Sequence, residues 1–122
     1  MIGYVTLGTN DLERAAQFYD RLLKEIGASR FMESDQFIAW AISPDKPALS
    51  VTKAFDGKPA TVGNGVMVAL AMRSPEQVDA FYQKAMELGA TDEGAPGPRG
   101  EGFYAGYFRD LDGNKLNAFC MS

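Results

Sequence analysis

Histidine, the side chain that most often carries acid–base catalysis and binds transition metals, is absent from this chain of 122 residues. No Ser-His-Asp or Cys-His nucleophile can therefore be assembled. The single cysteine, Cys120, cannot complete a zinc site without histidine. Tyrosines, amides, carboxylates and arginines are the groups left for chemistry.

The stretch "RDLDGNKLNAF", Arg109 to Phe119, carries several of these groups. Asp112-Gly113-Asn114 is typical of a hairpin turn, and it lacks the further acidic ligands and bidentate glutamate of a calcium loop. Arg109 has candidate salt partners in Asp110 and Asp112. Arg99, in a Gly/Pro-rich stretch, could contact an anionic ligand, although a solvated surface position is the simpler interpretation. Cys120 is expected to face a helix as part of the core.

An internal duplication indicates which elements position these groups. Tyr4 to Tyr19 ("YVTLGTNDLERAAQFY") align with Met67 to Tyr82 ("MVALAMRSPEQVDAFY") at an offset of 63 residues. Each copy reads as an alternating strand followed by a capped helix that ends at a glycine, Gly27 or Gly89. The expected N-caps are Asn10, with Glu13 three residues on, and Ser74, with Pro75 and Gln77 behind it.

Strand-like stretches follow each helix. They are Phe37 to Ile42 and Leu49 to Thr52 in the first half, Phe103 to Phe108 and Leu116 to Met121 in the second, and a short strand over residues 29–35. Gly94 to Gly102 is too rich in glycine and proline to predict regular structure, and Asp56 to Gly65 reads as a linker. The chain predicts an α+β fold of two paired β-α-β-β-β modules, at about 1–56 and 66–122, in a single domain with helices outside a curved mixed sheet.

The composition of the chain argues against two classes of partner, nucleic acids and membranes. The formal charge is −4 and no basic cluster is present, which argues against a nucleic-acid partner. No apolar run approaches the roughly 20 residues of a membrane helix, and the N-terminus lacks a signal-peptide pattern. We therefore expect a cytoplasmic protein with neither a nucleic-acid nor a membrane partner.

The chain resembles the vicinal oxygen chelate superfamily, which comprises glyoxalases, bleomycin-resistance proteins and extradiol dioxygenases. The resemblance rests on the paired halves and on two stretches, "VTLGTNDLERAAQFYDRLL" and "GAPGPRGEGFYAGYFRDLDGNKL". The resemblance implies a cavity enclosed by the sheets and a homodimer. It also implies four metal-ligand positions, on the first and last strands of each half, where this chain has Tyr4, Ser50, Met67 and Asn117. None of the four is a histidine or a carboxylate, so we expect neither a metal nor another cofactor.

If those positions point into the cavity, alternation along the strands places further residues beside them. Phe119 follows Asn117 on the last strand, Tyr107 lies on the strand before it, and Trp40, with Ile38 and Ile42, takes the matching place in the first half. The expected ligand-binding residues are Tyr4, Trp40, Ser50, Met67, Tyr107, Asn117 and Phe119.

Three functions remain open at this point. The first is a metal-independent protein that binds, and could sequester, a small aromatic or amphipathic drug or metabolite. The second is a glyoxalase-like lyase or isomerase, similar to lactoylglutathione lyase, that uses Tyr4 or Tyr107 as acid/base or holds a metal through unexpected carboxylates. The third is an interaction module whose cavity is filled by side chains.

Overall fold

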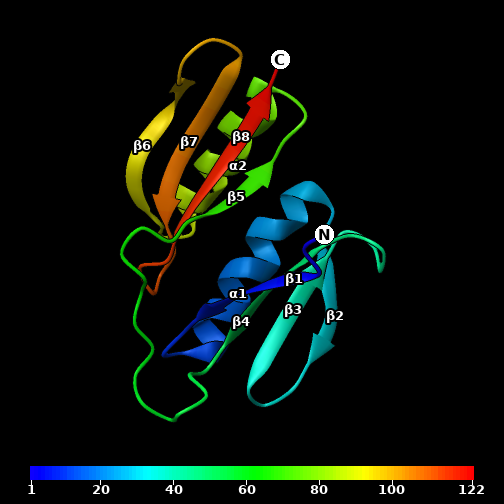
Figure 1. Cartoon of the computed structure of the whole chain (residues 1–122), viewed down its shortest axis with the longest axis vertical. Coiled ribbons are helices and arrows are strands. Elements are labelled where there is room, and N and C mark those ends of the chain that lie inside the picture. The colour runs from blue at the N-terminus through cyan, green and yellow to red at the C-terminus, as the bar shows by residue number, and fades with distance from the viewer. The chain divides into compact units, whose positions relative to one another are not determined.

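The computed structural model describes all 122 residues, and they form two compact units, Met1–Val62 and Gly63–Ser122. Each unit contains one α-helix and one four-stranded sheet in the order β-α-β-β-β (Figure 1). The boundary between the units falls inside the stretch that its composition predicts as a linker.

The first unit builds its sheet in the order β1-β4-β3-β2. Its strand β1 runs parallel to β4, and the other neighbours are antiparallel. The elements are β1 (Tyr4–Gly8), α1 (Leu12–Leu23), the 3-10 turn η1 (Lys24–Ile26), β2 (Ser29–Glu33), β3 (Phe37–Ala41) and β4 (Ala48–Thr52).

The second unit repeats this topology in the order β5-β8-β7-β6, with β5 parallel to β8. Its elements are β5 (Val68–Ala71), α2 (Pro75–Glu87), β6 (Thr91–Pro98), β7 (Phe103–Arg109) and β8 (Lys115–Met121). Neither sheet closes into a barrel. The predicted α+β fold of two β-α-β-β-β modules is confirmed.

The two helices begin at side-chain caps. Ser74 caps α2 as predicted, because its Oγ accepts a hydrogen bond from the Gln77 amide at 3.1 Å. The prediction of Asn10 as the cap of α1 is wrong. Asp11 takes that role and accepts from the Arg14 amide at 3.0 Å, while Asn10 bonds the backbone of Ala60 in both directions.

Each helix buries its apolar stripe against one face of its own sheet. From α1 the buried side chains include Phe18, Tyr19 and Leu22, and from α2 they include Val78 and Phe81. Fully burying an aromatic or aliphatic side chain contributes roughly 1.5–3 kcal/mol, so these stripes fix which face of each sheet carries the helix. The opposite face, turned away from the helix, is called the helix-free face below.

Strand β6 occupies a stretch that sequence reasoning placed outside regular structure, and that prediction is wrong for Gly94 to Pro98. The strand lies at the edge of its sheet, where a proline needs no partner for its missing amide hydrogen. Its pairing with β7 shifts register on both sides of Gly94, so the irregular composition is absorbed as bulges.

The turn between β7 and β8 is organised by Asp110. Its Oδ1 accepts hydrogen bonds from the amides of Asp112 and Asn114, each at 2.9 Å. Arg109 does not pair with either expected aspartate, because its Nε lies 3.2 Å from Glu93 on the neighbouring edge strand. The predicted hairpin is thus confirmed, and the predicted salt partner is wrong.

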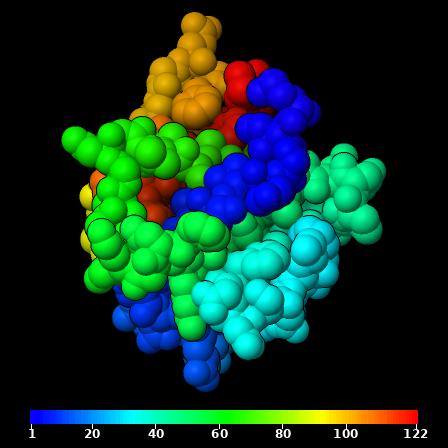
Figure 2. Space-filling view, turned by 60° about the horizontal axis from the view of Figure 1, so that its bottom comes forward, coloured from blue at the N-terminus to red at the C-terminus, as the bar shows by residue number.

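Most of the connecting segment, residues 56–65, lies at the surface, where Figure 2 shows it in green. No helix combines the length and apolar character needed to span a bilayer.

Candidate small-molecule site

The helix-free face of the first sheet is hollowed into a pocket of about 300 Å³. Its wall is mainly aromatic and aliphatic, with three hydroxyl side chains besides that of Tyr4. The lining residues are Tyr4, Thr6, Phe31, Met32, Phe37, Ala39, Ala48, Ser50 and Thr52. A volume of this size fits a small organic ligand at the lower end of the usual range.

Strand pairing places the predicted residues Tyr4 and Ser50 together in this wall. Ser50 is the Cα partner of Thr6, and their hydroxyl oxygens lie 2.8 Å apart. Ser50 also donates to the Val5 carbonyl at 3.1 Å, so its proton is engaged within the sheet. Tyr4 is 71% exposed, and its phenol hydroxyl forms no hydrogen bond within the chain. Its phenol is therefore the freer of the two polar groups.

A bulge in β2 gives the pocket its apolar rim. The register against β3 shifts between Arg30 and Met32, so one extra residue, Phe31, stands between paired positions. Both Phe31 and Met32 consequently contribute to the pocket, and each is 51% exposed. A regular strand would have turned one of them to the opposite face.

The prediction that Trp40 lines the pocket is wrong. Trp40 is 1% exposed and packs under α1, with its ring 5.6 Å from that of Tyr19. The Cα partner of Ser50 on β3 is Ala39, so Ala39 occupies the place assigned to Trp40. A shift of one residue along a strand moves a side chain to the other face of the sheet. Ile38, two residues before Trp40 on β3, therefore also lies on the helix side and not in the pocket.

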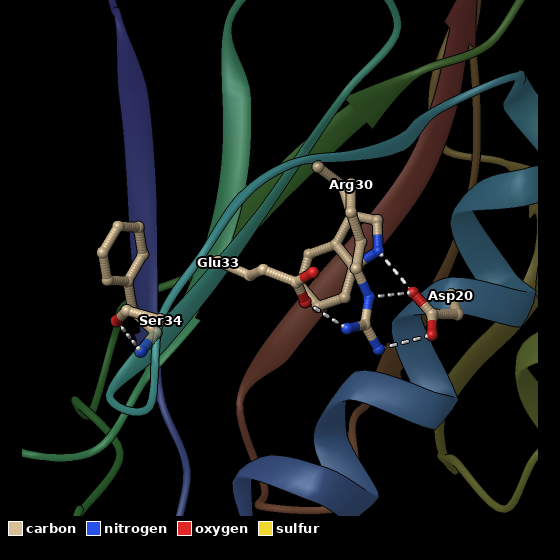
Figure 3. Close-up of polar contacts among 6 residues, drawn as sticks. Asp20, Arg30, Glu33 and Ser34 are labelled. Carbon is tan, nitrogen blue, oxygen red and sulfur yellow. Dashed lines mark hydrogen bonds and ion pairs between the residues drawn. The ribbon is translucent and has the colours of Figure 1, made fainter.

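Asp20 of α1 binds the indole of Trp40 and fixes its position. Its Oδ1 accepts from Trp40 Nε1 at 2.9 Å and from Arg30 Nε at 2.8 Å, and its Oδ2 accepts from Arg30 Nη2 at 2.7 Å (Figure 3). Arg30 also donates to Glu33 at 2.6 Å. The Arg30 hydrogen bonds, aided by that of Trp40, lower the pKa of Asp20. This cluster joins α1 to β2 and β3 on the face opposite the pocket.

On the second sheet, three predicted site residues share the helix-free face. Asn117 pairs with Tyr107, and Phe119 with Ala105, across β7 and β8. Phe119 stacks on Phe103 with ring centroids 5.5 Å apart. Cys120 is buried on the helix side of this strand, as predicted.

Met67 directly precedes β5 and is 40% exposed. The register supports its equivalence with Tyr4: Thr6 pairs with Ser50, and Ala69, which lies 63 residues after Thr6, pairs with Asn117. The duplication inferred from the sequence therefore extends to strand pairing.

Two tyrosine–aspartate hydrogen bonds tie α2 to the strands beneath it. Tyr82 donates to Asp92 at 2.6 Å, and Tyr104 donates to Asp79 at 2.7 Å. Burial, reinforced by the Asp92 carboxylate, raises the pKa of Tyr82 to about 12. These tyrosines lie on the helix side and are not part of the candidate site.

The four positions that correspond to family metal ligands do not fit a metal. Tyr4 brings a phenol, Met67 a soft thioether, and Ser50 and Asn117 a hydroxyl and an amide oxygen. No group of three or more His, Cys, Asp or Glu side chains lies together elsewhere in the chain. A divalent cation at these positions would lack any charged ligand.

Sequence reasoning missed Phe31, Phe37 and Ala39 as pocket residues. It also missed Lys115, whose ammonium group lies beside the predicted site residue Tyr107 on the second sheet. The β2 bulge leaves no signal in the sequence. Lys115, however, lies two residues before Asn117 on the same strand, so alternation alone could have found it.

Comparisons with known proteins agree with this architecture. The family model described as the Glyoxalase/Bleomycin resistance protein/Dioxygenase superfamily matches residues 1–118. A crystal structure of a glyoxalase/bleomycin resistance protein from Albidiferax ferrireducens T118 is 37% identical, covers 100% of this chain and 99% of its own, and superimposes with a TM-score of 0.91.

Two further solved structures show how widely the fold is shared. The hypothetical protein SA1046 from S. aureus is 25% identical, with coverage of 98% and 92% and a TM-score of 0.75. A lactoylglutathione lyase from Agrobacterium tumefaciens is 19% identical, with coverage of 98% and 92% and a TM-score of 0.73. No curated protein matched the sequence. The family match over nearly the whole chain and the strand order together show that this protein belongs to the Glyoxalase/Bleomycin resistance protein/Dioxygenase superfamily.

Proposed function

We propose that this chain is a metal-independent small-molecule-binding protein of the glyoxalase/bleomycin-resistance type, acting as a cytoplasmic homodimer. Its ligand is a small aromatic or amphipathic molecule, such as a drug or metabolite that the protein sequesters. The observation that carries this proposal is the apolar pocket of about 300 Å³ on the helix-free face of the first sheet.

The pocket has the mixture of surfaces that such a ligand needs. Phe31, Met32 and Phe37 offer an apolar wall, and Tyr4 offers an exposed phenol that can donate or accept a hydrogen bond. An amphipathic molecule would place its ring against the first group and its polar end near Tyr4. In the second unit, the proposed contacts of a ligand bound there are Met67, Tyr107, Asn117 and Phe119.

Binding is favoured over lyase or isomerase chemistry by the surroundings of the two tyrosines proposed as acid/base groups. Neither the Tyr4 nor the Tyr107 hydroxyl donates to a carboxylate within the chain. The Tyr4 hydroxyl forms no hydrogen bond within the chain, so no base is placed to take its proton. The two cations beside Tyr107, Arg99 and Lys115, lie over its ring.

Ligand-observed NMR with a panel of aromatic and amphipathic molecules tests the proposal. Ala39→Phe adds a phenyl group inside the pocket and should abolish saturable binding. Ala80→Phe adds the same group to an exposed position of α2 and should leave binding unchanged. Circular dichroism would check that both variants fold. Binding that survives Ala39→Phe in a folded protein would place the ligand elsewhere and contradict the proposal.

A further inference from the structure

Two cations flank one aromatic ring on the helix-free face of the second sheet. Arg99 Cζ lies 5.4 Å and Lys115 Nζ lies 5.6 Å from the centroid of Tyr107. Neither cation forms an ion pair with a carboxylate, although the chain as a whole carries a net charge of −4. The positive charges of Arg99 and Lys115 are therefore not neutralised by a direct carboxylate partner, whereas that of Arg109 is paired with Glu93.

The position of Arg99 is set by the strand beneath it. Its Nη2 donates to the Ala95 carbonyl at 2.7 Å, and its Nη1 donates to the Gly97 carbonyl at 3.0 Å. A Cβ at Gly94 or at Gly97 would lie only 3.2 Å from a guanidinium nitrogen. The two glycines leave space for the folded side chain, so the cation is held before any ligand arrives, which lowers the cost of binding.

Asn117 adds an unmet hydrogen bond to the same face. It is 1% exposed, it pairs with Tyr107 across β7 and β8, and its Oδ1 has no hydrogen-bond partner. Lys115 lies two residues before it on β8. A buried polar atom without a partner costs about 1–3 kcal/mol, so this oxygen is suited to accept a hydrogen bond from a bound molecule.

We propose that Arg99, Tyr107, Lys115 and Asn117, called the Tyr107 cluster below, bind a small molecule that carries a phosphate or carboxylate group next to a hydroxyl or amide N–H. The two cations bind the oxyanion, since both retain N–H groups beyond the bonds described. Asn117 Oδ1 accepts from the neighbouring donor. The Tyr107 cluster belongs to a different unit from the first-sheet pocket, and its ligand need not be the aromatic one.

Titration of the ¹⁵N-labelled full-length protein, followed by NMR, tests this assignment with four probes. Glycerol 3-phosphate and glycerate carry an oxyanion and a hydroxyl, inorganic phosphate carries only the oxyanion, and glycerol carries only hydroxyls. We expect saturable shifts centred on Tyr107 and Lys115 with one or both of the first two probes, weaker binding of phosphate and none of glycerol. The comparison of glycerol 3-phosphate with glycerate identifies which oxyanion is preferred.

Lys115→Gln removes one cation and should weaken binding about tenfold, the loss expected for one hydrogen bond to a charged group. Lys84→Gln removes the same charge from α2 and should leave the affinity unchanged. Asn117→Leu should abolish the preference for glycerol 3-phosphate over inorganic phosphate. If that variant does not fold, Lys115→Gln decides the question alone.

The proposal is overturned if no oxyanion probe binds saturably, or if Lys115→Gln and Lys84→Gln weaken binding equally. Neither result bears on ligand binding in the first-sheet pocket, which is tested separately with Ala39→Phe and the panel of aromatic and amphipathic molecules. A ligand lost from one site and kept at the other therefore identifies which proposal has failed.

Discussion

At the level of single residues, removal of the Asp20 carboxylate should destabilise the first unit. Asp20→Leu leaves the buried Trp40 indole N–H without an acceptor, at a cost of about 1–3 kcal/mol in unfolding free energy. Asp20→Asn keeps an acceptor and loses only a partly exposed ion pair with Arg30, worth about 0.2–1 kcal/mol. Urea denaturation followed by fluorescence of Trp40, the only tryptophan, would measure both. Equal losses would show that the indole hydrogen bond contributes nothing.

The same carboxylate predicts a pH dependence. Hydrogen bonds from Arg30 and Trp40 lower the pKa of Asp20 in the folded chain. Its contribution is therefore complete above the unfolded pKa of about 3.9 and is lost as pH falls through the lower folded value. The difference in Tm between wild type and Asp20→Asn should be largest near neutral pH and shrink below about pH 4. A difference that stays constant down to that range would contradict the assignment.

The error at Trp40 shows what residue patterns alone cannot determine. The alternation of Phe37 to Ala41 was visible, but the face that each residue occupies depends on pairing with β4, which is a long-range choice. Ala39 opposes Ser50, and a misalignment of one residue exchanged the two faces. On β8 the faces were assigned correctly, because the family resemblance places Asn117 towards the cavity and alternation along a regular strand gives the rest.

At the level of elements, strands β6 and β7 approach each other closely at Gly106 of β7. A Cβ at this position would lie 2.9 Å from Cγ of Pro96 on β6, so one strand must shift to accept it. We expect Gly106→Ala to destabilise the fold by about 1–3 kcal/mol, as overpacking usually does. Gly3→Ala, where no atom lies within 4 Å of the added Cβ, is the control and should change stability by less than about 0.5 kcal/mol. Equal stability of the two variants would mean that β6 shifts to accept the added methyl group without a measurable free-energy cost.

Helices were easier to predict than strands. Ser74-Pro75 and the glycines after each helix are local signals, and the structure confirms all of them, with Gly27 and Gly89 both at positive φ. Strand β6 was missed because its glycines and prolines are tolerated only at a sheet edge, and edge position is a property of the assembled sheet. Local chemistry therefore predicts where elements begin and end better than it predicts their neighbours.

At the level of the whole molecule, exposed apolar surface predicts self-association. Eleven large hydrophobic side chains are exposed, among them Phe31 and Met32 at the rim of the first-sheet pocket and Phe55 just before the connecting segment. Clustered exposed apolar residues mark interaction surfaces more often than plain solvent boundaries. We expect sedimentation equilibrium to give a dimer at micromolar concentration. A monomer across the accessible concentration range would remove the homodimer from the proposed function.

Metal content concerns the protein as a whole, because the family positions are distributed over both units. We expect protein purified without chelators to contain no stoichiometric Mn, Ni, Zn or Fe by elemental analysis. The reason is the donor set: Tyr4, Ser50, Met67 and Asn117 include neither a carboxylate, which Mn prefers, nor an imidazole, which suits Ni, Zn and Fe.

A variant with four substitutions, Tyr4→His, Ser50→Glu, Met67→His and Asn117→Glu, supplies the contrast. It restores ligands of the right chemistry, and we expect calorimetry to detect weak Ni or Mn binding that the wild type lacks. The affinity should stay well below that of a natural site, because the groups that orient metal-bound histidines were not selected here. Stoichiometric metal in the wild type would overturn metal independence, whereas no binding by the folded variant would show that these four positions do not converge.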